Sequence, residues 1–382
     1  MSDSMINVFQ PCVGQEELQL IAEVLQTNWL GHGSVVQEFE AAFASQLKTD
    51  PGQFVSTTSG TEAIFLAAEL FDFKSDDEII VPSISFIAVG SSVVAKHAKL
   101  VLCDVDPHSL NVTADYIAPY ITEKTKAVIV THYGGVPCDM DPILDLCLAH
   151  NIRVIEDSAC AVKSFYKGKA TGTLGDMGLW SFEAGKLITT GDGGMVYLNS
   201  EELITNAKEQ LYLGLTGSEK SGIDRSATGH EQWWEIQIGR PGRRAIMNNI
   251  AGAIGLAQLN KIDTFLVRRK AIYQRYSKEL AQYSWLTSPP LHGDGIEPSY
   301  YFYWIQLKRR DELAQFLREH GVYSTFRYWP LHKVPYFEQS ATKLPNSEFA
   351  SQQTLLLPLH QALSDDDVTR VLELMKTFGG RL

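Results

Sequence analysis

The chain has 382 residues, of which 45% are hydrophobic and 20% are charged, and its formal net charge is −12 at pH 7. A chain of this length is expected to form a large domain and a smaller one. The acidic balance argues against a nucleic-acid-binding protein, because no basic stripe is present to neutralise phosphates. A small anionic substrate remains compatible with it, because a few local arginines can hold a phosphate inside an acidic protein.

The spacing of the cysteines and the composition of the N-terminus indicate in which cellular compartment the protein is expected. The cysteines are Cys12, Cys103, Cys138, Cys147 and Cys160, and no two of them form a CxxC pair. Their scatter argues against a zinc ribbon or a disulfide framework, and it predicts reduced, mostly buried thiols and no metal site. The first residues lack the basic start and apolar run of a signal peptide, and no apolar stretch reaches the ~18 residues of a membrane span. We therefore expect a soluble, cytoplasmic protein that binds no membrane.

Over the first two thirds of the chain, short apolar runs alternate with amphipathic segments. The runs predicted as strands are Phe54–Thr57, Glu78–Pro82, Leu100–Asp104, Ala127–His132, Arg153–Asp157, Gly178–Phe182 and Gly194–Leu198. The segments predicted as helices are Gln15–Thr27, Val35–Gln46, Thr61–Phe71, Asp141–His150 and Ala245–Phe265. Several runs carry no charge, which is typical of strands buried between two layers of helices. This pattern predicts an α/β domain over residues 1–265 with a mostly parallel, seven-stranded sheet.

After Arg268 the pattern changes. The elements predicted here are a helix at Ala271–Ala281, a strand at Tyr301–Leu307, a helix at Asp311–Glu319, an extended stretch at Tyr323–Tyr328 and a helix at Asp365–Thr377. They predict a small α+β domain over residues 266–382, with one undivided domain as the alternative. The segment Gly214–Trp234, rich in Gly, Ser and charge, is interpreted as a loop that shapes a substrate site.

The first motif with chemical meaning is the run Ser56–Ala63 (STTSGTEA), where a predicted strand ends and a helix begins. The N-terminus of a helix presents free N–H groups and the positive end of the helix dipole, so this run is a candidate phosphate site. Ser and Thr also cap ordinary helices, and that interpretation stays open for the run considered alone.

The second motif is Val154–Ser158 (VIEDS), which places an acidic pair at the end of a buried strand. A buried carboxylate is costly unless something pairs with it. Asp157 lies at the carboxyl end of the strand, where α/β proteins bind ligands, and it would there keep a pyridinium nitrogen protonated. The alternative is an aspartate that caps the next turn.

The third motif places Lys186 between a strand end and the glycine-rich turn Gly191–Gly194. A lysine in a partly desolvated crevice is expected to have a lowered pKa and to form an imine with an aldehyde. A lone lysine would be interpreted as a surface residue. Lys186, however, follows Asp157 by 29 residues, with the phosphate-type turn upstream of both. Pyridoxal phosphate needs three contacts: a site for its phosphate, a carboxylate at its ring nitrogen and a lysine that forms an imine with its aldehyde.

With these motifs in their order, the chain resembles the DegT/DnrJ/EryC1/StrS family of sugar aminotransferases over nearly its whole length. The motifs that carry the resemblance are Asn28–Gly33, Glu38–Glu40, Thr58–Ala63, Val81–Phe86, Thr131–Gly135, Asp139–Asp141, Glu156–Ala159, Ser181–Phe182 with Lys186, Gly191–Gly194, Ile250–Leu259 and Tyr328–His332. The resemblance implies the fold type I architecture of enzymes that depend on pyridoxal phosphate. It also implies a homodimer whose active site lies at the subunit interface.

The resemblance assigns roles around the cofactor ring. Lys186 would form the imine and then move the proton between substrate and cofactor, while Asp157 would pair with the pyridine nitrogen. Phe86 would stack on the ring, with plain core packing as its alternative. Family members that eliminate a hydroxyl carry histidine at the lysine position, so Lys186 favours transamination. The family has Gln or His where this chain has Cys160, which leaves the contact to the ring hydroxyl open.

Around the cofactor phosphate, the resemblance assigns contacts to Gly60, Thr61 and Ser181. In the family, the segment before the Ile-x-Ala helix reaches the phosphate held by the partner subunit. That segment is altered here, and Arg243 or Arg244 would serve because a cation suits a phosphate dianion. Solvated arginines at a helix start are the alternative.

For substrates, the resemblance implies a nucleotide-linked keto-deoxy sugar, on dTDP or UDP, as amino acceptor and L-glutamate as donor, in a ping-pong reaction. Trp29, Gly31, Tyr328 and His332 are candidate substrate contacts, because aromatic faces stack while ring nitrogens form hydrogen bonds. A cyclitol or another free cyclic ketone is the alternative acceptor. A regulatory protein on the same scaffold is the alternative from another class, and the presence of both the lysine and the aspartate disfavours it.

Overall fold

The computed structural model describes residues 5–216, 234–337 and 342–381. At its centre is a seven-stranded sheet with the order β1-β9-β8-β5-β4-β2-β3. Its strands are β1 (Phe54–Thr57), β2 (Glu78–Pro82), β3 (Lys99–Cys103), β4 (Thr125–Thr131), β5 (Arg153–Asp157), β8 (Met177–Ser181) and β9 (Gly194–Leu198). The pairs from β8 through β3 are parallel, and β9 is antiparallel to both β1 and β8. The expected α/β fold with a mostly parallel sheet is confirmed.

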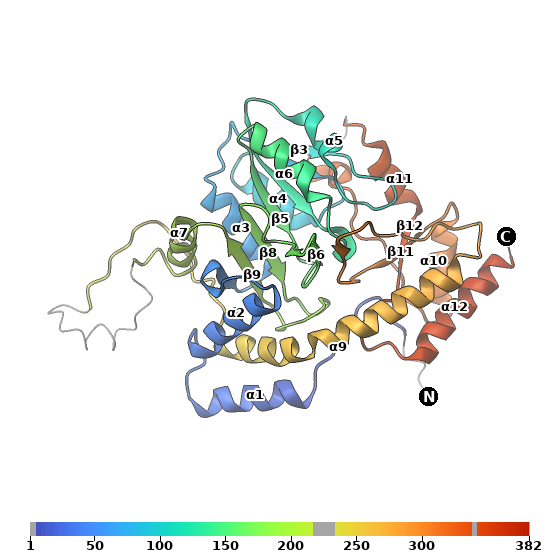
Figure 1. Cartoon of the computed structure of the whole chain (residues 1–382), viewed down its shortest axis with the longest axis horizontal. Coiled ribbons are helices and arrows are strands. Elements are labelled where there is room, and N and C mark those ends of the chain that lie inside the picture. Colours follow the sequence, from blue (N-terminus) through green and yellow to red (C-terminus); the bar gives the residue numbers. More distant parts are fainter. Residues whose placement is uncertain (1–4, 217–233, 338–341, 382) are drawn as a thin grey trace.

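Helices cover both faces of this sheet (Figure 1). Helices α3 (Gly60–Leu70) and α4 (Ile87–Ala95) share a hydrophobic cluster with one face, and α2 (Ser34–Gln46) and α6 (Met140–Ala149) pack on the other. Successive side chains of a strand point to opposite faces, so Ile155 lies with α3 while Val154 lies with α6. This alternation also sends Glu156 and Asp157 of β5 to opposite faces.

Helix α9 (Asn249–Leu280), which is 32 residues long, links the sheet to the C-terminal part of the chain. The Asn248 side chain caps it by accepting a hydrogen bond from the N–H of Ala251 at 3.0 Å. Its first turns pack closely on α2, since a Cβ at Gly255 would stand 2.5 Å from the Phe39 ring. A larger residue at Gly255 would therefore push the two helices apart.

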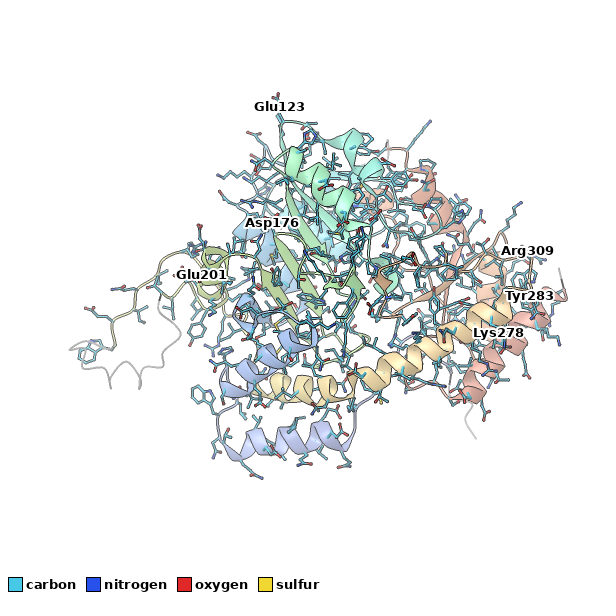
Figure 2. The ribbon with its side chains drawn as sticks, in the orientation of Figure 1. Glu123, Asp176, Glu201, Lys278, Tyr283 and Arg309 are labelled. Carbon is cyan, nitrogen blue, oxygen red and sulfur yellow. The ribbon has the colours of Figure 1, made fainter. Side chains whose placement is uncertain are left out.

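The C-terminal part packs around the second half of α9. It contains β11 (Tyr303–Gln306) and β12 (Thr354–Leu357), which pair antiparallel, with α10 (Arg310–Glu319), α11 (Pro345–Gln353) and α12 (Asp365–Gly379). Its hydrophobic cluster also takes in Ile6, whose N–H donates to the carbonyl of Gly321 at 2.9 Å. In Figure 2, Lys278 and Arg309 mark this end of the molecule, while Glu201 lies toward the other end.

The remaining elements lie at the edges of these two parts. They are α1 (Gln15–Gln26), α5 (Ala114–Ile117), α7 (Glu201–Leu211), and β6 (Phe165–Tyr166), β7 (Lys169–Ala170) and β10 (Ile296–Glu297), which form a three-stranded sheet. All five cysteines are free thiols. In the ranges described above, no helix is both long and apolar enough to cross a membrane, and no three His, Cys, Asp or Glu side chains are placed to hold a metal.

Several elements differ from the prediction. Helices α4, α5, α7 and α11 and strands β6, β7, β10 and β12 are not among the predicted elements. Helix α4 was missed because its residues are nearly all apolar or small and so show little helical periodicity. The stretch 323–328 is not a strand; it makes only the single bridge of Thr325 to Leu356. The predicted helices on either side of residue 265 are one helix, α9, so the predicted boundary falls inside a helix and the division into two domains stays a prediction. Most of the predicted loop Gly214–Trp234, residues 217–233, lies outside the described residues.

Candidate active site

A pocket of about 210 Å³ lies at the carboxyl ends of β1, β5 and β8. The sequence-predicted site residues that line it are Gly60, Thr61, Phe86, Asp157, Ser181, Lys186 and Tyr328. These residues come from distant points of the chain, and the parallel strands bring them together because their carboxyl ends meet at one edge of the sheet.

The start of α3 forms one wall of the pocket. The Ser59 side chain caps the helix by accepting a hydrogen bond from the N–H of Glu62 at 3.0 Å. The N–H groups of Gly60 and Thr61, the first two residues of α3, have no partner within the helix. A Cβ at residue 60 would stand 2.6 Å from the Cβ of Ser181, so only glycine lets β8 approach the helix start this closely. The result is a narrow cradle of N–H groups and hydroxyls that suits a phosphate.

Asp157 ends β5 at the floor of the pocket, where only 6% of it is exposed. One carboxylate oxygen accepts the N–H of Ala159 at 3.0 Å. Burial raises the pKa of the Asp157 carboxyl, although this hydrogen bond and the charge of Lys186 oppose the rise. A cationic partner inside the pocket would stabilise the ionised form of this carboxylate, and a protonated pyridine nitrogen is such a partner.

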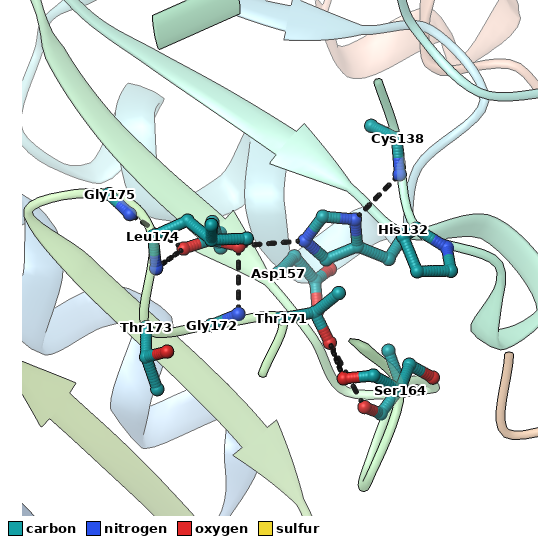
Figure 3. A network of polar contacts seen from close by, with 12 residues as sticks. His132, Cys138, Asp157, Ser164, Thr171, Gly172, Thr173, Leu174 and Gly175 are labelled. Carbon is teal, nitrogen blue, oxygen red and sulfur yellow. Dashed lines mark hydrogen bonds and ion pairs between the residues drawn. The ribbon is translucent and has the colours of Figure 1, made fainter. Parts of the chain in front are cut away.

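The neighbouring acid, Glu156, is fully buried on the opposite face of the sheet. Figure 3 shows the polar network there, with His132, Gly172 and Leu174. The Glu156 oxygens accept the backbone N–H groups of Gly172, Leu174 and Gly175, each at 2.7 Å. His132 Nε2 lies 3.0 Å from the same carboxylate, and the N–H of Cys138 donates to His132 Nδ1 at 3.1 Å. Nδ1 therefore carries a lone pair, and Nε2 carries the hydrogen that is donated to Glu156. The acidic pair thus divides into a structural Glu156 and a pocket-facing Asp157.

Lys186 lies in the turn after β8, with its Nζ 3.6 Å from the Cys160 sulfur and 5.3 Å from the centre of the Tyr301 ring. The Tyr301 hydroxyl donates to the carbonyl of Gly185 at 2.9 Å and so fixes this turn. Burial lowers the pKa of Lys186, but Cys160, Tyr301 and Asp157 together raise it more, so that it lies above its ordinary value. The expected lowering of the Lys186 pKa is therefore wrong for this structure, because groups that can carry negative charge outweigh desolvation.

Phe86 and Tyr328 line the pocket near Lys186, and Cys160 lies beside it. The Phe86 ring is 44% exposed and meets the Tyr328 ring edge-to-face, with the ring centres 5.7 Å apart. An exposed aromatic face at a pocket suits stacking on a planar ligand. The Cys160 sulfur lies 3.4 Å from the Tyr328 hydroxyl, so Cys160 and Tyr328 form a polar pair beside Lys186.

The two arginines predicted for the phosphate do not line the pocket. Arg243 forms ion pairs with Glu62 and Glu69 of α3. The Arg244 guanidinium lies over the Tyr212 ring, 5.2 Å from its centre. Their expected contact would be made across a subunit interface, and it stays a prediction.

Of the predicted substrate contacts, only Tyr328 lines the pocket. Trp29 is 61% exposed in the loop before α2, together with Gly31, and its indole N–H donates to the carbonyl of His32 at 2.8 Å. His332 is buried, with Nδ1 2.7 Å from the Ser83 hydroxyl, and burial lowers its pKa. These roles also stay predictions.

Two side chains beside the pocket were not singled out from the sequence. Arg327 lines the pocket and immediately precedes Tyr328. Tyr301 holds the Lys186 turn and belongs to the aromatic run 300–304. The arginine next to a predicted site residue was the available signal for Arg327, whereas nothing distinguished Tyr301 from its aromatic neighbours.

Comparisons with known proteins agree with this geometry. The model of the DegT/DnrJ/EryC1/StrS aminotransferase family matches residues 11–376. The dTDP-4-dehydro-2,3,6-trideoxy-D-glucose 4-aminotransferase of Saccharopolyspora spinosa is 44% identical over 371 residues, which are 97% of this chain and 95% of that protein. The solved aminotransferase TlmJ from Streptoalloteichus hindustanus matches with a TM-score of 0.92 at 43% identity, covering 98% of each chain. Spr1654 from Streptococcus pneumoniae, solved in a PLP form, matches with a TM-score of 0.89 at 26% identity over 99% of each chain.

Proposed function

Because the chain belongs to the DegT/DnrJ/EryC1/StrS family of aminotransferases, which depend on pyridoxal phosphate, we propose that it transfers an amino group from L-glutamate to a nucleotide-linked keto-deoxy sugar. The observation that carries the proposal is one pocket that joins the start of α3, Asp157 and Lys186. The relative in Saccharopolyspora spinosa acts on a dTDP-linked sugar, which supports dTDP as the nucleotide.

The residues of the pocket fit the cofactor. When bound, pyridoxal phosphate supplies an aldehyde that carries the amino group and a ring that withdraws electrons. The N–H groups at the start of α3 and the Ser181 hydroxyl would hold its phosphate. The buried Asp157 carboxylate would keep the ring nitrogen protonated, and Phe86 would cover the ring. Lys186 would take a proton from the substrate carbon and pass it to the cofactor.

The two halves of the reaction use the same groups. In the first half, L-glutamate gives up its amino group and leaves as 2-oxoglutarate. In the second half, the keto sugar takes the amino group while Lys186 moves the proton in the opposite direction. This sequence is a ping-pong reaction, and in our proposal two copies of the chain form a homodimer with the pocket at their interface.

A spectroscopic titration tests this function. The protein is loaded with pyridoxal phosphate and mixed with L-glutamate, and the visible absorption is followed. We expect glutamate to convert the lysine-bound band into that of the amino form, and a dTDP-linked 4-keto-deoxy sugar to restore the first band. The UDP analogue and an inosose are run in parallel. Restoration by the inosose alone would favour the cyclitol reaction, and no response to glutamate would exclude it as the donor.

The raised pKa of Lys186 predicts how cofactor capture depends on pH. A raised pKa keeps the amine protonated through neutral pH, and only the neutral amine attacks an aldehyde. We therefore expect the rate of capture of pyridoxal phosphate by the cofactor-free protein to rise about tenfold per pH unit from about pH 6.5 to 9. Stopped-flow absorbance measures this rate. A rate that levels off between about pH 7 and 8 would show instead that the amine has a lowered pKa.

A further inference from the structure

One cation in the pocket, Arg327, has no ion-pair partner among the described residues. Arg327 and Lys186 are the basic residues among the described lining residues, and Asp157, Glu183 and Asp192 are the acidic ones. Within residues 5–216, 234–337 and 342–381, no carboxylate pairs with the Arg327 guanidinium and no acceptor takes a hydrogen bond from it. A partly buried guanidinium without an acceptor indicates that an anion outside the chain completes it.

The other arginines around the pocket have partners. Arg243 is held by Glu62 and Glu69. Arg269 is fully buried, and its guanidinium donates to the side chain of Gln361 and to backbone carbonyls, among them that of Leu359 at 3.1 Å. Arg327 differs from both because none of its five N–H donors is bonded to an acceptor within the described part of the chain.

Stacked aromatic rings hold Arg327 in place. Its guanidinium carbon lies 4.7 Å from the centre of the Phe9 ring. Phe9 in turn stacks on Tyr301, with centres 5.6 Å apart and planes 7° apart. The Tyr301 ring also contacts Lys186, whose Nζ lies 5.3 Å from the ring centre. Arg327 and Lys186 therefore share one rigid support, and stacking on an aromatic ring leaves the edge of a guanidinium free for a bidentate acceptor.

We propose that Arg327 binds the α-carboxylate of the amino donor, an inference that rests on the proposed function. In an amino acid this carboxylate is bonded to the same carbon that carries the amino group, so it must enter the pocket together with that group. Lys186 acts at that carbon, and Arg327 lines the same pocket of about 210 Å³. Glu183 and Asp192 are exposed at the pocket and repel anions there, which leaves Arg327 as the place for a carboxylate.

The test measures the first half-reaction alone. Wild type, Arg327→Gln and Arg327→Lys are loaded with pyridoxal phosphate, and the apparent Kd and limiting rate for L-glutamate are read from the absorption change. We expect Arg327→Gln to raise the Kd about 10- to 100-fold, which is the loss of one charge-assisted pair, while the limiting rate changes less. Arg327→Lys should recover part of the affinity. Arg153→Gln is the matched control, because Arg153 pairs with Asp176 at the other end of β5.

One pair of ligands and one unreactive ligand identify the anion that Arg327 binds. L-Glutamine keeps the α-carboxylate and lacks the side-chain one, and the α-amide of glutamate has the reverse pattern. We expect Arg327→Gln to bind L-glutamine more weakly than wild type does, and to bind the α-amide with the same affinity as wild type. Glutarate, which cannot react, gives a readout without turnover, and its calorimetric Kd should rise in the variant. The affinity for pyridoxal phosphate and the Kd of the keto sugar should stay unchanged.

The outcomes separate the two proposals. If wild type reacts with L-glutamate and Arg327→Gln is unimpaired, the Arg327 assignment is wrong and the proposed function stands. A variant that instead loses affinity for the keto sugar or for pyridoxal phosphate also overturns the assignment, because the anion is then a phosphate. If wild type binds pyridoxal phosphate but does not react with L-glutamate, L-glutamate is not the donor, and the assignment of Arg327 to its α-carboxylate is wrong as well.

Discussion

Lys186→Ala is expected to abolish both the lysine-bound absorption band and amino transfer, lowering the rate of the glutamate half-reaction by at least about 10⁴-fold. The reason is that Lys186 is the only amine among the described residues that line the pocket. Without it, none of the described lining residues is an amine that could carry the proton between the substrate carbon and the cofactor. The measurement is the absorption spectrum with pyridoxal phosphate, followed by a single-turnover reaction with L-glutamate.

The matched control for this variant is Lys169→Ala, because Lys169 is exposed and lies outside the pocket. Circular dichroism should show that both variants fold as wild type does. A Lys186→Ala protein that is folded and still converts glutamate at more than about one hundredth of the normal rate would contradict the role given to Lys186.

Asp157→Asn is expected to lower the limiting rate of both half-reactions by roughly 10²- to 10⁴-fold. Asparagine has nearly the same volume but no negative charge, so it would not keep the ring nitrogen of the cofactor protonated. The same change should not destabilise the cofactor-free protein. Burial raises the pKa of Asp157, so folding of the ionised form is opposed above its ordinary pKa, and a neutral amide removes that cost.

Thermal denaturation of the cofactor-free protein at about pH 7.5 checks the stability half of this prediction: the midpoint should stay or rise in Asp157→Asn. Asp141→Asn is the control, because Asp141 is exposed and paired with Lys167 at the surface. A variant with full activity would exclude the ring-nitrogen role. A large fall in the midpoint would show that Asp157 acts mainly in holding the fold together.

The sheet could be predicted because its strands are short runs rich in apolar residues, and this pattern is local in the sequence. All the strands predicted for it occur, and the motifs that begin or end at them line one pocket. Helix α4 could not be predicted, because its residues are nearly all apolar or small, so no charged face reveals the helical period.

Within the site, contacts between distant residues could not be predicted. The bond from Tyr301 to Gly185 joins residues 116 positions apart, and it helps to place Lys186 among groups that raise its pKa. The partners of Arg243 on α3 were likewise invisible in the sequence, because Glu62 and Glu69 meet it only after folding. The sequence therefore allowed roles to be assigned to residues, but it did not allow the pKa of Lys186 or the ion pairs of Arg243 to be predicted.

The stacking of Phe9 between Tyr301 and Arg327 has a consequence for how the protein is made. A ribosome releases Phe9 near the start of synthesis and its two partners near the end. At about 5–20 residues per second, Phe9 waits roughly 15–60 s for them. During that time Phe9 lacks both of these partners, even if the sheet has already formed. The stack beside the pocket is thus completed late, by joining one of the oldest parts of the chain to one of the newest.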